Sequence, residues 1–460
     1  MTPKFIKLIT LSAAAALCSL SALAQQPKLP HGYFWKKLPN GLEVVVIENT
    51  KVPLTTIEIA VKNGAYTEGP EYSGLSHLFE HMFFKANKDY PNQEKFLKRT
   101  QELGAIWNGT TGNERVNYYF TVGKDSLDAG LQLMNSSIRF PIYKEEDMKK
   151  ERPVVDGEFQ RNESSPGFQL YYDLSKLMWG DLITRKMPIG IHEVINTATP
   201  EKMMIIKDKY YHPNNSLLII CGDVKHEEGF KKAEAIFGSW PNSGFDPIVK
   251  YPIPAFKPIA KTEMFVKEMS IARTPFTMYA WQGPSYGTDS ASTIAADVFS
   301  TMLGMNSSKM QQALIDKGLA SSAGVSYSTS RYVGPISIFV VPNPNKLKEC
   351  HAEVLNQISQ WGKPDYYTDE QLADAKAILL RDHSREMEKP SSLPSQVSYQ
   401  WCSTSLDYYT NLTENYQKVS RADIAKYIST YITDKPMVAG IILTPELSKQ
   451  VNAASFFVAK

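Results

Sequence analysis

Apolar and polar positions in the first half of the chain follow two different periods. Residues 42–47 and 55–62 are apolar or alternate apolar and polar side chains, which predicts two strands, and a Pro39-Asn-Gly41 turn precedes the first. Further short strands are predicted at 106–111, 117–122 and 216–221. Apolar residues three and four positions apart predict helices at 73–84, 92–104, 124–140, 145–162, 168–179 and 199–211. Within 145–162, Pro153 predicts a kink or a helix that restarts there.

The second half repeats this rhythm. Strands are predicted near 276–281, 323–328, 336–341 and 438–442, and helices near 290–303, 308–317, 347–361 and 368–387. The helix that begins after Thr199 and its following strand match, at a fixed offset, the helix after Ser420 and the strand at 438–442. The pattern predicts an α+β fold of two homologous domains, each a mixed or antiparallel β-sheet covered by helices.

Prolines separate the two halves. Five of them punctuate a stretch with little periodicity, which predicts a linker at 241–262. The predicted domains are therefore an N-terminal domain at 25–240 and a C-terminal domain at 263–460.

The N-terminus resembles an export signal. Lys4 and Lys7 precede an apolar run at 8–23, and Ala22-Leu23-Ala24 offers a small-x-small cleavage site. We predict a signal peptide at 1–24 and export of the chain, to the periplasm if the organism is bacterial; an uncleaved anchor is the alternative. No later run is long and apolar enough to span a membrane, so no stable membrane insertion is expected after cleavage.

Charge and cysteine content exclude some classes of function. The chain has 50 Lys and Arg and 48 Asp and Glu, and the signal peptide removes two lysines and no acids. A balanced mature chain argues against nucleic acid as a partner. Cys221, Cys350 and Cys402 remain after cleavage and form no disulfide framework, although a Cys350–Cys402 bridge is conceivable. No cysteine pair has zinc-site spacing, so a metal here needs histidine and carboxylate ligands.

The predicted helix at 73–84 carries the candidate chemistry. His77 and His81 lie one turn apart on one face, with Glu80 beside them and apolar side chains on the other face. Two such imidazoles can bind one zinc ion, and the carboxylate can take a proton from zinc-bound water. A buried, hydrogen-bonded core histidine or a chance surface pair are the alternatives. The order His-x-x-Glu-His is nevertheless a metallopeptidase signature.

A catalytic zinc needs a third protein ligand. Glu151 and Glu158 are two turns apart and share a helix face. One could bind zinc while the other holds the far nitrogen of a ligating histidine. Spacing does not choose between them, and acidic helices are usually solvated surfaces.

With these motifs the sequence resembles the pitrilysin/insulinase-type zinc metallopeptidases, in the half-length group related to the mitochondrial processing peptidases. Further matching motifs are Leu38-Pro-Asn-Gly-Leu42, Gly64-Ala65, Gly104-Ala-x-x-Asn108, Tyr118-Tyr119, Tyr210-Tyr-His-Pro-Asn-Asn-Ser216 and Cys221-Gly-Asp223. The resemblance implies one Zn2+ per chain, held by His77, His81 and Glu158, with Glu151 as the outer carboxylate and Glu80 as the base. It also implies a mitochondrial-processing-peptidase-like fold.

The same resemblance implies a zinc-dependent endopeptidase that cleaves short, unstructured peptides. The substrate would lie extended along 106–111 as an added strand, in contact with Asn108, Gly109 and Thr111. The alternative for Asn108-Gly109 is an ordinary turn.

One expected feature is missing from the second half. Members of the family often place an Arg and a Tyr there, in a Leu-Arg-x-x-x-x-Leu-x-Tyr segment, but Ile315 and Ser321 occupy those positions here. We therefore expect a heterodimer in which a homologous partner subunit supplies the Arg/Tyr pair, with Arg331-Tyr332 as a less well spaced alternative. The competing functional class is a non-catalytic peptide-binding or scaffold subunit with structural zinc.

Overall fold

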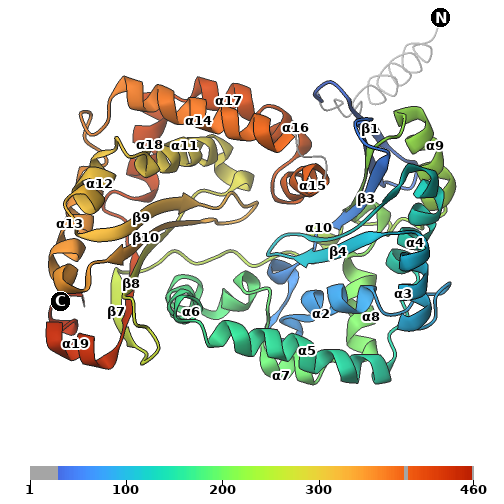
Figure 1. The fold of residues 1–460 in the computed structure, drawn as a ribbon, viewed down its shortest axis with the longest axis horizontal. Helices are drawn as coiled ribbons and strands as arrows, with labels where there is room; N and C mark the ends of the chain where they lie inside the picture. Colours follow the sequence, from blue (N-terminus) through green and yellow to red (C-terminus); the bar gives the residue numbers. More distant parts are fainter. Residues whose placement is uncertain (1–28, 388–391, 458–460) are drawn as a thin grey trace, which may run out of the picture.

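Two β-sheets, one from each half of the chain, organise the structure, a computed structural model that describes residues 29–387 and 392–457 (Figure 1). The predicted signal peptide at 1–24 lies outside the described residues. Helices cover both sheets, as the α+β prediction requires.

The first sheet has six strands in the order β1-β2-β6-β3-β5-β4. β6 runs parallel to β2 and antiparallel to β3, and the other pairs are antiparallel. β4 lies at the edge and pairs only with β5 among the described strands. The strands are β1 (Tyr33–Lys37), β2 (Glu43–Glu48), β3 (Leu54–Val61), β4 (Ile106–Thr111), β5 (Val116–Gly123) and β6 (Ser216–Gly222).

The second sheet repeats this topology with five strands in the order β7-β11-β8-β10-β9. β11 is parallel to β7 and antiparallel to β8, as β6 is to β2 and β3. The sequence prediction missed β7, which has no buried residue. The strands are β7 (Glu263–Glu268), β8 (Phe276–Gln282), β9 (Ala320–Tyr327), β10 (Pro335–Pro342) and β11 (Val438–Leu443).

The six helices predicted before the linker are present, and the structure adds α7, α9 and α10, which the sequence prediction missed. The expected restart at Pro153 does not occur, because one helix runs through it and buries Met148, Val155 and Phe159 at helical spacing on both sides. The helices are α2 (Leu75–Phe83), α3 (Gln93–Glu102), α4 (Leu127–Arg139), α5 (Glu145–Glu163), α6 (Pro166–Trp179), α7 (His192–Asn196), α8 (Pro200–Tyr210), α9 (His226–Phe237) and α10 (Pro247–Lys250).

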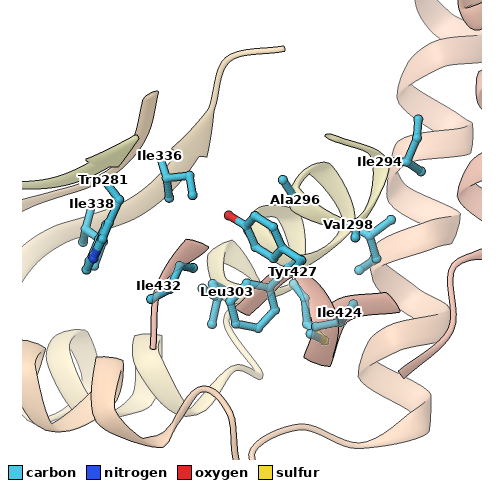
Figure 2. Packing of buried hydrophobic residues seen from close by; sticks show 14 of the residues in the cluster. Trp281, Ile294, Ala296, Val298, Leu303, Ile336, Ile338, Ile424, Tyr427 and Ile432 are labelled. Atoms are coloured by element: carbon cyan, nitrogen blue, oxygen red, sulfur yellow. The ribbon is translucent and has the colours of Figure 1, made fainter. Parts of the chain in front are cut away.

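The second half packs its helices against its own sheet around a large aromatic and aliphatic core. Figure 2 shows members of this core: Trp281, Ile336 and Ile338 come from the sheet, and Leu303 and Ile424 come from the helices. The helices are α11 (Tyr286–Gly304), α12 (Lys309–Gln311) with a π-helical turn (Gln312–Asp316), α13 (Leu347–Gln360), α14 (Asp369–Met387), α15 (Leu393–Ser403), α16 (Leu406–Thr410), α17 (Leu412–Lys418), α18 (Arg421–Tyr431), α19 (Pro445–Val451) and α20 (Ala454–Phe457).

Each half of the chain also contributes one helix that packs on the sheet of the other half. α6 packs against β8 and β11 of the second sheet, and α15 packs against β3 and β6 of the first. Residues 251–262 cross between the sheets without helix or strand. The predicted boundaries at 240 and 263 fall between the two sheets. They remain predictions, because α6 and α15 each pack on the sheet of the other half and the sheets alone do not define separate domains.

Two further expectations concern the cysteines and the membrane. Cys350 and Cys402 are buried free thiols, so the conceivable bridge between them does not form in this structure. No described helix combines the length and the apolar character that a membrane crossing requires.

Candidate metal centre

The apolar face of α2 anchors this helix in the core of the first half. Its apolar face, including Leu75, Leu78 and Met82, is fully buried, and Phe79 stacks on Tyr211 with ring centroids 4.1 Å apart. This packing fixes the rotation of the helix and therefore the direction of its opposite face.

The beginning of α2 is held by a buried carboxylate. Glu68 accepts hydrogen bonds from the backbone N–H groups of Gly74 (2.7 Å) and Ser76 (2.5 Å), which would otherwise lack partners at a helix N-terminus. Burial raises the pKa of Glu68 to about 7. Gly74 has a φ of +93° and touches Gly190, where a Cβ on Gly74 would lie 2.8 Å from the Gly190 Cα.

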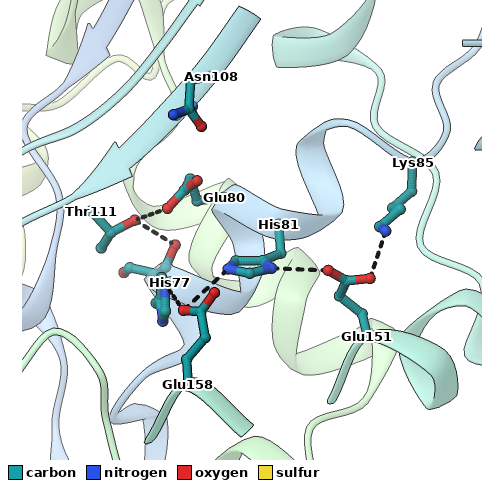
Figure 3. A network of polar contacts seen from close by, with 10 residues as sticks. His77, Glu80, His81, Lys85, Asn108, Thr111, Glu151 and Glu158 are labelled. Atoms are coloured by element: carbon teal, nitrogen blue, oxygen red, sulfur yellow. Dashed lines mark hydrogen bonds and ion pairs between the residues drawn. The ribbon is translucent and has the colours of Figure 1, made fainter. Parts of the chain in front are cut away.

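His77 and His81 present their rings side by side on the polar face of α2. The ring centroids are 4.8 Å apart and the planes nearly perpendicular. Glu158 approaches from α5, with its Oε2 3.6 Å from His77 Nε2 and 3.9 Å from His81 Nε2 (Figure 3). Glu151, two turns earlier on α5, binds the other side of His81, with Oε1 2.9 Å from Nδ1.

The chemical types of these side chains are suited to binding a zinc ion. Two imidazoles and a carboxylate are a ligand set of catalytic zinc sites. Burial, followed by the nearby His81, lowers the pKa of His77 to about 4, so this imidazole is neutral and can donate a lone pair. Burial opposes protonation of His81, but the hydrogen bond with Glu151 and the charges of the three nearby carboxylates outweigh it and raise the pKa of His81. Such carboxylates favour a cation between the rings.

Glu80 also lies near the imidazoles. Its carboxylate and one nitrogen of each ring lie within 4.8 Å of one another, so distance alone does not separate Glu80 from Glu158 as a ligand. Their partners differ, because Thr111 Oγ1 donates a hydrogen bond to Glu80 Oε2 at 3.2 Å, whereas Glu158 Oε2 lies between the two Nε2 atoms. Burial raises the pKa of Glu80 despite the opposing charge of His81 and the Thr111 hydrogen bond. This arrangement fits Glu158 as a ligand and Glu80 as a base.

A cavity of about 450 Å³ joins the imidazoles to the edge strand β4. Asn108, Gly109 and Thr111 line it together with the residues of α2 and α5. Gly109 also lies close to Glu80, because a Cβ there would lie 2.7 Å from Glu80 Cγ. Its missing side chain makes room for Glu80.

All residues predicted for the site therefore meet in one cavity: His77, Glu80, His81, Asn108, Gly109, Thr111, Glu151 and Glu158. The sequence prediction missed Glu68 and Lys85. Lys85 Nζ lies 2.5 Å from Glu151 Oε2. Its position four residues after His81, in the turn that follows α2, was the signal that could have found it.

The residues at the missing Arg/Tyr positions offer no replacement. Ile315 packs against the core of the second half, and Ser321 Oγ donates to the Val341 carbonyl at 3.4 Å. The alternative arginine is engaged elsewhere: the Arg331 guanidinium donates to the carbonyls of Cys402 (3.2 Å) and Thr404 (2.5 Å).

Comparisons with known proteins point to one family of peptidases. The family model described as "Insulinase (Peptidase family M16)" matches residues 43–180, and the one described as "Peptidase M16 inactive domain" matches residues 197–379. The chain is similar to the zinc protease PqqE of Helicobacter pylori, with 23% identity over 405 residues that cover 86% of this chain and 89% of that protein. An uncharacterized zinc protease of Rickettsia felis is 29% identical over 203 residues, which cover 44% of this chain and only about half, 49%, of that protein.

Solved structures share the fold. A protease from Helicobacter pylori superposes with a TM-score of 0.78 at 22% identity, covering 91% of this chain and 100% of that one. The periplasmic protease PqqL from Escherichia coli gives 0.75 at 13% identity and covers 92% of this chain and 48% of that one. From its motifs, its repeated topology and these matches, the chain belongs to the insulinase family of peptidases, family M16.

Proposed function

We propose that this chain is the zinc-bearing, catalytic subunit of an endopeptidase that hydrolyses short, unstructured peptides. The observation that carries the proposal is the cavity beside β4, where two imidazoles, the Glu158 carboxylate and a separately held Glu80 converge. The names of the relatives, which are zinc proteases, support the same class of reaction.

His77, His81 and Glu158 would hold one zinc ion through Nε2, Nε2 and a carboxylate oxygen. A zinc ion bound there supplies a Lewis acid that polarises the scissile carbonyl and acidifies the attacking water. Glu151 keeps the His81 ring in place from the opposite side.

Glu80 accepts the proton of the attacking water and passes it to the nitrogen of the leaving amine. Its raised pKa, caused by burial, makes its carboxylate a stronger base than a solvated glutamate. Thr111 holds Oε2, and the absent side chain of Gly109 leaves space for the carboxylate.

The peptide would add a strand to the outer edge of β4. Backbone N–H and C=O groups on this edge have no partner strand among the described residues and can pair with an extended peptide regardless of its sequence. Asn108, Gly109 and Thr111 would then lie beside the scissile bond.

A homologous partner subunit would supply the Arg and Tyr that the second half lacks. The motivating observation is that Ile315 and Ser321 provide no cationic or phenolic donor. The predicted signal peptide and the periplasmic relative PqqL support export as the setting of this assembly.

The catalytic role is tested by Glu80→Gln together with zinc analysis. The wild type should hold one zinc ion and cleave an unstructured peptide; the variant should keep the zinc and lose about 10²–10⁴-fold in rate. Unchanged cleavage by the variant would contradict the role of Glu80. Peptide binding without cleavage in every assembly would favour a non-catalytic, peptide-binding subunit with structural zinc.

The partner is tested by assaying the chain alone and with the product of a homologous neighbouring gene. Each missing donor to the tetrahedral intermediate is worth about 10²–10³ in rate, so addition of the partner should raise cleavage by at least this factor. Full activity of the isolated chain, unchanged by any homologue, would show that no partner completes the site.

A further inference from the structure

Lys85 lies in the turn after α2 and reaches back to the metal centre. Its backbone N–H donates to the Met82 carbonyl at 3.1 Å, and its side chain extends to α5 (Figure 3). Nζ lies 2.5 Å from Glu151 Oε2, and the side chain is only 15% exposed. Among the described residues that line the cavity, Lys85 is the one lysine or arginine.

This contact holds Glu151 at both of its oxygens. Oε2 binds the Lys85 ammonium and Oε1 binds His81 Nδ1, while the Glu151 side chain is 9% exposed. A planar carboxylate bound at both oxygens cannot turn about its Cγ–Cδ bond without losing one contact. Because an anionic carboxylate only accepts hydrogen bonds, His81 donates through Nδ1 and keeps its lone pair on Nε2, which faces Glu158.

His77 has no comparable support. Its Nδ1 is buried and has no hydrogen-bond partner among the described residues. Among the described residues, the contacts from Lys85 through Glu151 to His81 are therefore the one hydrogen-bonded support of an Nδ1 atom of the two imidazoles.

We infer that Lys85 is a positioning residue of the metal centre: it holds Glu151 in the orientation that turns His81 Nε2 toward the zinc position. This inference rests on the proposed role of His77, His81 and Glu158 as zinc ligands. Lys85 acts through Glu151 and touches no reacting atom.

The first test measures zinc affinity by competition with a chromophoric chelator. Lys85→Met removes the ammonium and keeps the chain length, and should weaken zinc binding about 10–100-fold, the usual effect of losing an outer partner of a metal ligand. Lys85→Arg should stay within a few-fold of the wild type, because it keeps a cation at Glu151. Lys98→Met, at an exposed lysine of α3, is the matched control and should bind zinc like the wild type.

The second test asks whether Lys85 acts through Glu151. Glu151→Gln alone should weaken zinc binding, and adding Lys85→Met should cause little further loss, since the contact is already broken. A purely structural role would instead give additive losses and lower the stability of the metal-free protein in proportion. Lys85→Gln, measured in the same way, replaces Lys85→Met should that variant fail to fold.

The outcomes separate this inference from the proposed function. A wild type that binds no zinc overturns the proposed function itself. Wild-type zinc binding that Lys85→Met leaves unchanged overturns the inference alone. Unchanged zinc affinity with a raised KM would make Lys85 a substrate contact, which also overturns it.

Discussion

Each half of the chain forms a cavity from corresponding helices and strands, but different side chains line the two cavities. In the first half, α2, β4 and α5 enclose the cavity of the metal centre. In the second half, their topological counterparts α11, β9 and α14 line a larger cavity of about 700 Å³. α11 packs on β9 and α14 as α2 packs on β4 and α5.

The correspondence extends to single positions. Asp297, Ser300 and Thr301 line the second cavity from α11 with the spacing of His77, Glu80 and His81 on α2. The offset that relates these residues also takes Glu158 to Ile378, which lines the second cavity from α14.

The difference shows how little of the fold depends on the metal. An aspartate, two hydroxyls and an aliphatic side chain are not a zinc ligand set, because only the aspartate is a strong ligand for this ion. The sheet, the helix and the cavity persist without the ligands. Substitutions in corresponding elements of the two halves test this contrast.

The largest effect is expected from His77→Ala. Loss of one of three ligands should abolish stoichiometric zinc binding and reduce peptide cleavage by at least about 10³-fold, because the metal supplies several kcal/mol of transition-state stabilisation. Asp297→Ala, at the matched position of α11, should leave zinc content unchanged. Metal analysis and a peptide assay check both variants, and a full zinc equivalent in His77→Ala would contradict the ligand assignment.

A smaller effect is expected from Gly109→Ala. The new Cβ would meet Glu80 Cγ at 2.7 Å and displace the carboxylate. We expect kcat to fall about 10²-fold with zinc content retained, because displacement of a catalytic group by about 1 Å costs this much.

A control on the counterpart strand β9 is Gly324→Ala. A Cβ at Gly324 would collide with the Phe339 ring, so this variant should lose about 1–3 kcal/mol of stability and keep its kcat. Equal losses of kcat in both variants would mean that Gly109 acts through general packing rather than through Glu80.

The carboxylates at the beginnings of α2 and α11 should change the stability of the protein with pH in opposite directions. Burial raises the pKa of Glu68 to about 7, so its stability contribution is present below pH 4.5 and lost as the pH rises toward 7. Relative to Glu68→Gln, the wild type should therefore lose about 1–3 kcal/mol of unfolding free energy between pH 4.5 and 8.

Asp289 in the first turn of α11 behaves in the opposite way. Burial opposes its ionisation, but hydrogen bonds from Ser292 and the Tyr431 hydroxyl outweigh it and lower the pKa of Asp289. Its contribution is present above pH 3.8 and is lost as the pH falls, so the wild type should lose stability relative to Asp289→Asn only in acid. Urea unfolding from acid to about pH 8 checks both variants. Stability changes of the same sign at Glu68 and Asp289 would contradict the directions of their pKa shifts.

The smallest effect is expected from Ser300→Ala. Ser300 stands where Glu80 stands in the first half, and its buried Oγ has no hydrogen-bond partner among the described residues. Removal of such a hydroxyl should be neutral or stabilise the protein by up to about 1 kcal/mol, in contrast to the loss of activity in Glu80→Gln. Thermal unfolding measures this, and a clear destabilisation would reveal a partner for Ser300.

Local physics explains what could be predicted from the sequence. The spacing of His77 and His81 follows from the helical period, and the capping residues Thr199 and Ser420 accept the backbone N–H bonds that the pattern predicts. The repeated order of strands and helices also reads along the chain, because each element is set by its own apolar periodicity. These features require no knowledge of distant contacts.

Only the tertiary structure decided how the side chains of α2 and α5 meet in the site. From spacing alone Glu151 and Glu158 were equivalent, and packing of α5 against α2 places Glu151 at Nδ1 of His81 and Glu158 between the Nε2 atoms. Packing likewise decided that α5 continues through Pro153 and that α6 and α15 each cover the other half's sheet.

The same distinction applies to the supporting residues. Glu68, Lys85 and Gly109 act through contacts with α2, α5 and Glu80 that only the packed structure brings together. The sequence by itself determined which side chains were available for a zinc site and which helix carried them. The tertiary structure decided which atom of each faces the cavity, because that depends on packing between elements far apart along the chain.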